Sequence, residues 1–258
     1  MSTNTCKENL TMNQGAAEKK LTIFYTLTAG LGAIASITSG IAWGHWKQTL
    51  DQCVGRNCSC ILYGIHTPTV FLGGSNYACA WITYGPFIYI LISIAMACFH
   101  GFRVLFTKKK VVTRTVTAKN EVGETIELHA VQGESTNPLP TAFWITMACI
   151  TSIFTIYALT HFAIFTDGFL TTCKQYRLAL HRQLGFGGTV TPVIHERLAC
   201  TAIFDFMDYI QPDSGRAYRE GFINTGLDLT IGISASFFAW VLFLAASVIN
   251  IKYAATKV

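Results

Sequence analysis

The feature that constrains this chain most is a set of four apolar stretches of about 25 residues, where about 20 suffice for a helix to cross a bilayer. They are Leu21–Trp46, Ile82–Phe106, Ala142–Thr166 and Leu227–Ile251. A buried helix of a soluble protein stops after about 10 to 14 apolar residues. Charged residues make up 13% of the chain, against about 25% in soluble domains. The sequence therefore predicts an all-α membrane protein, built as a four-helix transmembrane bundle.

Basic residues predict that both termini face the cytosol, because Lys and Arg concentrate in the short cytosolic loops of membrane proteins. They occur in the N-terminal tail (1–20), in and beside the loop 107–141, and in the C-terminal tail (252–258). The loop 47–81 carries only two, and the six in the loop 167–226 are matched by six acidic residues. We therefore expect 47–81 and 167–226 to be the first and second outer loops of a protein of the plasma membrane or another membrane of the secretory pathway.

The cysteines agree with this topology, because disulfides form in oxidising compartments and are rare in the cytosol. Six of the nine cysteines lie in the two predicted outer loops and are candidate disulfide partners: Cys53, Cys58, Cys60, Cys79, Cys173 and Cys200. Spacing leaves their connectivity open, but we expect Cys58 and Cys60 to reach different partners and one bridge to join the two outer loops. Metal binding by Cys58 and Cys60 together with His45 is the weaker alternative in such a compartment.

Three other sets of residues are candidate sites. Asn57 opens the acceptor tripeptide Asn57-Cys58-Ser59, which predicts a glycoprotein unless a bridge at the cysteine blocks the transfer. A small-residue stripe on the first span lets another helix approach, either within the bundle or from a partner; its members are Gly32, Ser36, Gly40 and Gly44. A basic cluster after the second span either fixes topology or attracts anionic lipid; it consists of Arg103, Lys108, Lys109 and Lys110.

Local patterns predict structure in two of the loops. Val111–Thr117 and Thr125–Val131 are rich in β-branched residues and flank a turn-like cluster, which indicates a small cytosolic β-hairpin. An isolated hairpin is only marginally stable in water, so this one needs the helix ends or a partner. In the second outer loop, Phe169–Leu184 continues the third span as a helix. We also expect a short helix at His195–Tyr209 and a helix from Arg216 into the fourth span.

The chain carries no recognisable catalytic motif, so we expect no enzyme, no cofactor and no metal site. Polar residues of the second outer loop lack the spacing of a hydrolase elbow or a zinc site; they are His181, His195, Glu196 and Ser214. Within the spans, His100, His161 and Asp228 lie near the predicted interfaces rather than at a midplane, which disfavours ion-coupled transport. The net charge of +5 comes from basic residues beside span ends, so nucleic acid is not an expected partner.

Short motifs follow one another in a characteristic order around the spans. They are Cys60-Ile61-Leu62-Tyr63, Cys79, Tyr84-Gly85-Pro86, His100-Gly101-Phe102-Arg103-Val104-Leu105-Phe106, Cys173, Tyr218 and Phe222. This layout resembles the transmembrane protein 179 family of small four-span proteins, over most of the chain from the first span to the fourth. The resemblance implies a four-span fold and assigns no role to individual residues. The predicted hairpin and the long second outer loop depart from the family.

Two functions fit these features. The first is a non-enzymatic auxiliary or adaptor subunit, whose disulfide-braced outer loops dock onto a partner membrane protein. The second is a homo-oligomeric pore-forming channel, because large-pore channel families also carry a Cys-x-Cys in the first outer loop, as Cys58-Ser59-Cys60 does here. The polar residues of the spans are mainly Ser and Thr, which disfavours a pore. We therefore favour the auxiliary subunit; the sequence leaves the partner and the oligomeric state open.

Overall fold

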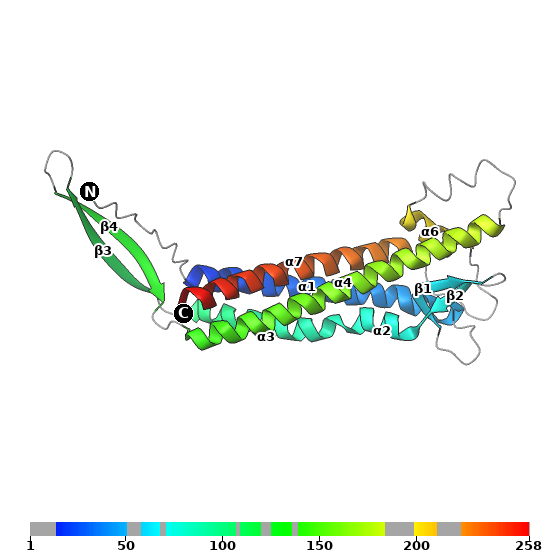
Figure 1. The fold of residues 1–258 in the computed structure, drawn as a ribbon, viewed down its shortest axis with the longest axis horizontal. Coiled ribbons are helices and arrows are strands. Elements are labelled where there is room, and N and C mark those ends of the chain that lie inside the picture. The colour runs from blue at the N-terminus through cyan, green and yellow to red at the C-terminus, as the bar shows by residue number, and fades with distance from the viewer. Residues whose placement is uncertain are drawn as a thin grey trace.

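Four long helical segments form the body of the protein. The computed structural model describes residues 14–50, 58–67, 71–106, 109–119, 125–135, 139–183, 199–210 and 223–257. The helices are α1 (Gln14–Leu50), α2 (Asn76–Tyr84) followed by α3 (Pro86–Phe106), α4 (Thr141–Gln183) and α7 (Thr225–Lys257) (Figure 1). The segments long and apolar enough to cross a membrane are Gln14–Lys47, Asn76–Phe106, Thr141–Leu178 and Thr225–Ala255. The four predicted spans are thus confirmed as helices of sufficient length and composition.

The long helices lie side by side in a bundle that carries different structures at its two ends (Figure 1). α1 packs along both α3 and α7, and α7 packs along α4. One end, called here the disulfide end, carries the antiparallel strands β1 (Cys60–His66) and β2 (Phe71–Gly74) and the short helix α6 (Cys200–Ile210). The other, the hairpin end, carries β3 (Lys109–Lys119) and β4 (Thr125–Ser135). The two predicted outer loops therefore meet at one end, opposite the predicted cytosolic hairpin.

Small residues of α1 allow the second helical segment to approach closely. A Cβ atom added at Gly32 would lie 2.6 Å from an aromatic side chain of α3, and one at Gly40 would lie 3.3 Å from Thr83 Cγ2. Between them, the Ser36 hydroxyl donates a hydrogen bond to the Thr83 carbonyl oxygen at 2.6 Å. A Cβ atom added at Gly44 would meet nothing within 4 Å. Three positions of the small-residue stripe therefore pack inside the chain's own bundle, and Gly44 lies open.

Aromatic side chains fill the interior between α3 and α4. The Tyr89 ring of α3 meets Tyr157 and His161 of α4, with ring centroids 6.4 and 6.2 Å apart. Nearer the hairpin end, Phe99, which is 39% exposed, stacks on Phe143 with centroids 5.2 Å apart. Edge-to-face and stacked contacts of this kind are favourable aromatic geometries. Because Tyr89 is only 1% exposed, this part of the bundle interior is packed with side chains.

A break between α2 and α3 leaves one backbone carbonyl for another helix to satisfy. Pro86 has no N–H, so the Ile82 carbonyl cannot accept the usual helical hydrogen bond. His161 Nε2 donates to this carbonyl oxygen at 2.9 Å. The Tyr157 hydroxyl donates to the Gly85 carbonyl oxygen at 3.1 Å. His161, which lies inside a candidate span, is therefore a hydrogen-bond donor that links α4 to the break.

The β-hairpin predicted between the second and third spans is confirmed. β3 and β4 pair in antiparallel register, from Lys109 opposite Ser135 to Lys119 opposite Thr125. Both strands are longer than the β-branched runs that predicted them, because ladder hydrogen bonds use the backbone and continue through residues of lower strand propensity. The hairpin extends from the bundle at the opposite end from α6 (Figure 1).

Two helix starts differ from their predicted positions. α1 begins at Gln14, so the last residues of the predicted tail 1–20 are helical; Glu18 packs against α3 and stabilises this early turn. The helix predicted from Arg216 does not continue unbroken into the fourth span, because residues 223–224 are not helical and α7 begins at Thr225; residues 216–222 lie outside the described residues. Asn224 caps α7, with its Oδ1 accepting the Leu227 N–H at 2.8 Å.

The helices predicted in the second outer loop are partly described. α4 runs to Gln183 without interruption, which confirms the predicted continuation of the third span. α6 spans Cys200–Ile210 and overlaps the C-terminal part of the short helix predicted at His195–Tyr209. Residues 195–198, at the start of that prediction, lie outside the described residues.

Candidate functional site

Disulfides tie the short elements of the disulfide end to the bundle. Cys60 of β1 is bonded to Cys79 of α2, and Cys173 of α4 is bonded to Cys200 of α6. The paired Cα atoms lie 5.5 and 5.6 Å apart, which is normal for disulfides. Cys58 is also disulfide-bonded. Cys53, the remaining candidate cysteine, and Asn57, the candidate glycosylation site, lie outside the described residues.

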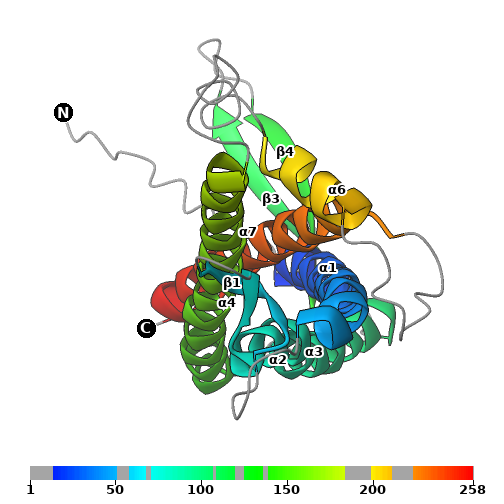
Figure 2. The same ribbon diagram turned by 90° about the vertical axis from the view of Figure 1, so that its right-hand side faces the viewer.

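The predicted bridge between the two outer loops is wrong. Cys173 and Cys200 are the only cysteines of the second loop, and they pair with each other. The physical reason is the packing of α6 against both α4 and α7 (Figure 2). This packing brings Cys200 of α6 next to Cys173 of α4. Within each loop, the disulfide therefore joins a short element to a neighbouring helix.

Hydrogen bonds connect the two predicted outer loops, through β1 and α4. The Thr172 hydroxyl donates to the Ile61 carbonyl oxygen at 2.9 Å and accepts the Gly64 N–H at 3.0 Å. Thr172 is 0% exposed, so neither backbone group has ready access to solvent there. Farther along, the His66 N–H donates to Gln175 Oε1 at 3.4 Å. β1 is thus held on α4 by bonds that depend on single side chains.

Tyr63 binds β1 to α4 through contacts of its ring and its hydroxyl. Its φ of 58° is unusual for a residue other than glycine, so the surrounding contacts hold a strained backbone in place. The ring lies against Gly168, where an added Cβ atom would come within 2.7 Å of Tyr63 Cε2. The hydroxyl donates to the Ile164 carbonyl oxygen at 2.9 Å. Burial, with a further contribution from Asp167, raises the pKa of Tyr63 to about 12, so the hydroxyl remains a donor at neutral pH.

A second hydrogen-bonded network joins α1, α7 and α6. Trp46 Nε1 donates to Thr225 Oγ1 at 2.8 Å, and that hydroxyl donates to Asp208 Oδ1 at 2.6 Å. The Thr225 N–H donates to Asp208 Oδ2 at 2.8 Å, so a carboxylate of α6 caps the N-terminus of α7. Burial raises the pKa of the Asp208 carboxyl group. Three helices therefore meet at one buried threonine.

The tied elements share one hydrophobic core. Side chains from α1, β1, α2, α4, α6 and α7 contribute to it, including Trp46, Leu62, Ile82, Phe165 and Phe204, each at most 1% exposed. Burying side chains of this size is the main source of stability for such a unit. The disulfides and hydrogen bonds then fix how its elements sit on that core, which gives the disulfide end a defined surface.

That surface exposes large apolar side chains. Tyr77 of α2 is 82% exposed and Ile65 of β1 is 57% exposed. The Cys60–Cys79 bridge holds these two elements together. Aromatic residues also gather where α1 and α2 meet: the Trp43 ring lies edge-on to Tyr84, with centroids 6.2 Å apart. Trp and Tyr are enriched at membrane–water interfaces, which is consistent with an interface at this level of the bundle.

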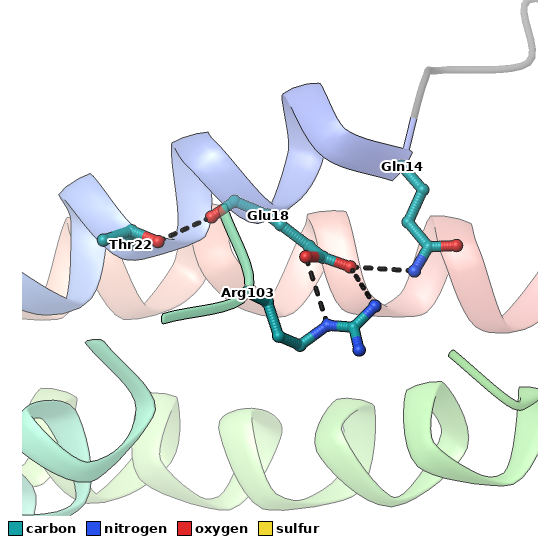
Figure 3. A network of polar contacts seen from close by, with 4 residues as sticks. All are labelled: Gln14, Glu18, Thr22 and Arg103. Atoms are coloured by element: carbon teal, nitrogen blue, oxygen red, sulfur yellow. Dashed lines mark hydrogen bonds and ion pairs between the residues drawn. The ribbon is translucent and has the colours of Figure 1, made fainter. Parts of the chain in front are cut away.

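At the hairpin end, an ion pair connects α1 to α3 (Figure 3). Arg103 donates from Nε to Glu18 Oε2 and from Nη2 to Glu18 Oε1, both at 3.3 Å. Gln14 Nε2 adds a hydrogen bond to Glu18 Oε1 at 2.8 Å. Glu18 is only 3% exposed, so its carboxylate depends on these partners. Arg103, a member of the predicted basic cluster, thus pairs with a buried carboxylate, and its predicted contact with lipid stays a prediction.

The other members of the predicted basic cluster remain untested as lipid contacts. Lys108 lies outside the described residues, and Lys109 and Lys110 are the first residues of β3.

Asp228 lies in the first turn of α7, where a carboxylate complements the positive end of the helix. Among the residues that the structure describes, no group of three or more His, Cys, Asp or Glu side chains is placed to hold a metal ion.

Sequence reasoning missed the residues that make these contacts across helices. Thr172, Thr225 and Glu18 lie in helices that pack against one another, but nothing in their spacing along the chain indicates the partner. Two signals were readable. Pro86 must leave a helical carbonyl unpaired, and Gly168 marks a close approach within a helix.

No protein-family model, curated protein or solved structure matches this chain. The resemblance to the transmembrane protein 179 family therefore stays a prediction, as does the absence of catalysis.

Proposed function

We propose that this protein is a non-enzymatic auxiliary or adaptor subunit that docks onto a partner membrane protein through its disulfide end. The proposal rests on Ile65 and Tyr77, two exposed side chains that the fold holds in fixed positions. Both are large and exposed, and both stand on elements tied to the bundle by the Cys60–Cys79 bridge. Preorganised apolar side chains lose little freedom on binding, which makes them effective anchors in an interface.

The interior of the bundle supports a binding role over conduction through a single chain. Tyr89, Phe165 and Phe243 are each at most 1% exposed and occupy the space between the helices. Tyr89 meets the Phe243 ring of α7 edge-on, with centroids 5.8 Å apart, so aromatic side chains cross the interior from α3 to α7. A continuous water-filled path through such packing needs these rings to move aside.

The lipid-facing side of the spans also disfavours a pore formed between copies of the chain. Threonines exposed there use their hydroxyls within their own helix: Thr26 donates to the Thr22 carbonyl oxygen and Thr160 to the Ile156 carbonyl oxygen. Such internally bonded hydroxyls present mainly a methyl group outward. A homo-oligomeric pore would need a polar lining between subunits, so it remains the alternative that the experiment must address.

Site-specific photo-crosslinking in the native membrane tests the proposal. A benzoylphenylalanine at position 65 or 77 should form one adduct of defined mass with a different membrane protein. The same probe at position 153 is the control, because Ile153 of α4 is 65% exposed and lies within a span. That position should form adducts with lipid only.

Two outcomes contradict the proposal. Adducts between copies of the chain, together with a closed homo-oligomer in native mass spectrometry, would favour the pore. Equal crosslinking of the same protein from positions 65, 77 and 153 would show that the disulfide end has no special part in docking.

A further inference from the structure

Each of the four long helices contributes one buried polar side chain to a cluster in the hairpin half of the bundle. The four-helix polar cluster consists of Tyr25 of α1, His100 of α3, Thr151 of α4 and Asn250 of α7, and none is more than 2% exposed. Tyr25 stacks on His100 with ring centroids 6.0 Å apart. Asn250 Nδ2 donates to the Tyr25 hydroxyl at 3.3 Å and to Thr151 Oγ1 at 3.4 Å. Tyr25 is therefore the link between the histidine and the asparagine.

Several polar atoms of this region have no hydrogen-bond partner among the described residues. They are both ring nitrogens of His100 and Oδ1 of Asn250. The Ser93 hydroxyl, two turns from His100 on the buried face of α3, also lacks a hydrogen-bond partner. Trp144 Nε1 also lacks a partner among the described residues, and the preceding residue, Phe143, contacts the His100 ring.

The orientation of Asn250 follows from its neighbours. The Thr151 hydroxyl donates its proton to the Met147 carbonyl oxygen at 2.7 Å, so it can only accept from Asn250. Asn250 must therefore turn its amide nitrogen toward Thr151, which leaves Oδ1 as the unpartnered atom. Because the Tyr25 hydroxyl accepts from the same nitrogen, its own proton is also available to another acceptor.

Hydrocarbon offers no hydrogen bonds, so buried polar groups in a membrane protein must find partners inside the protein. Proteins commonly meet this need with buried water, which makes about three hydrogen bonds to otherwise unsatisfied groups. A neutral imidazole offers one donor and one acceptor, and Asn250 Oδ1 and Ser93 Oγ offer acceptors. Donors and acceptors are thus both present, which suits water better than an ion of either sign.

We propose that the four-helix polar cluster is a binding site for ordered water inside the membrane-spanning bundle. Water molecules bind at the ring nitrogens of His100 and at Oδ1 of Asn250. The hairpin half of the bundle is then hydrated internally, although its outer surface is apolar. This inference is independent of the partner at the disulfide end.

Radiolytic footprinting of the full-length protein in lipid nanodiscs, in ¹⁸O-labelled water, tests the site. Hydroxyl radicals formed from bound water label adjacent side chains even when bulk solvent does not reach them. After correction for intrinsic reactivity, Tyr25 and His100 should incorporate ¹⁸O about tenfold faster than Phe243, since an apolar core site stays dry. Phe243 is the control because it is buried to the same 1% as Tyr25. Equal labelling of Tyr25 and Phe243 would overturn the proposal.

A double variant assigns the water to this cluster. His100→Phe with Asn250→Leu removes the unpartnered atoms of the cluster itself, which belong to His100 and Asn250, and retains side-chain bulk. Labelling of Tyr25 should then fall to the level of Phe243, while the helix content measured by circular dichroism stays unchanged. Persistent labelling of Tyr25 in a folded double variant would refute the assignment. If the variant does not fold, the comparison of Tyr25 with Phe243 in the unmodified protein still decides.

Discussion

Replacing Thr172 with valine should loosen β1 from α4 while preserving the shape of the buried side chain. The hydroxyl of Thr172 donates to the Ile61 carbonyl oxygen and accepts the Gly64 N–H, at 2.9 and 3.0 Å. Valine provides neither interaction. Two backbone groups of β1 are then left without a partner at a position that is 0% exposed.

The expected loss of stability follows from these two groups. An unsatisfied buried donor or acceptor costs about 1 to 3 kcal/mol. We therefore expect Thr172→Val to lower the free energy of unfolding by about 3 kcal/mol, or about two orders of magnitude in the unfolding equilibrium constant. The Tyr63 contacts with α4 still hold part of β1. We therefore expect a loss near the lower end of the range obtained by adding the costs of the two unsatisfied groups.

Thr160→Val is the matched control for this change. Thr160 lies on the same helix, but it is exposed and its hydroxyl donates only to the Ile156 carbonyl oxygen of its own helix, at 2.9 Å. Its replacement should change the free energy of unfolding by less than about 0.5 kcal/mol. Both variants are measured by SDS-induced unfolding from mild detergent, followed by tryptophan fluorescence.

A second measurement localises the effect. Detachment of β1 should expose the Cys60–Cys79 bridge, so a thiol reductant should cleave it faster in Thr172→Val than in Thr160→Val. The reasoning would be refuted if Thr172→Val were no less stable than Thr160→Val. It would also fail if stability fell while the reduction rate of this bridge stayed unchanged, because the damage would then lie elsewhere.

Three further predictions concern charge and disulfides. Because burial raises the pKa of Asp208, the folded state holds this proton more tightly than the unfolded state, so its contribution to stability is greatest below the ordinary pKa of about 4 and declines as pH rises through the raised value. Melting temperatures measured from pH 4 upward should show this decline, and Asp208→Asn should lack it. Arg103→Met leaves the Glu18 carboxylate buried and unpaired and should cost about 3 to 5 kcal/mol in chemical unfolding, whereas adding Glu18→Gln should recover most of the loss; no recovery would contradict the pairing. Cys60→Ser should cost about 3 kcal/mol and reduce surface biotinylation, while Cys98→Ser, at an exposed free thiol, should change neither.

Local sequence patterns predicted the elements whose formation depends on nearby residues. The apolar runs predicted four membrane-length helices, because a helix in hydrocarbon satisfies its own backbone and needs only length and apolar side chains. The β-branched runs on either side of a turn predicted the β3–β4 hairpin for a similar reason. In each case, the hydrogen-bond partners are close in sequence.

Disulfide pairing was predicted less well. The candidate cysteines were identified, and the structure bonds the described ones at the disulfide end. Their pairing depends on where β1, α2 and α6 fold back, which the spacing of six cysteines along a chain does not reveal. The expected bridge between loops failed for this reason, and the hydrogen bonds of Thr172 connect those loops instead.

The sequence by itself therefore determined four helices of membrane-spanning length, the hairpin, the cysteines available for bridging and a stripe of small residues on α1 that another helix can approach. Only the tertiary structure decided which side chains meet across helices: Thr172 with β1, Thr225 with Trp46 and Asp208, and Arg103 with Glu18. Helix formation is local, because its hydrogen bonds join residues about one turn apart. A hydrogen bond between helices depends on the rotation and depth of both, and these are set only when all of the helices pack together.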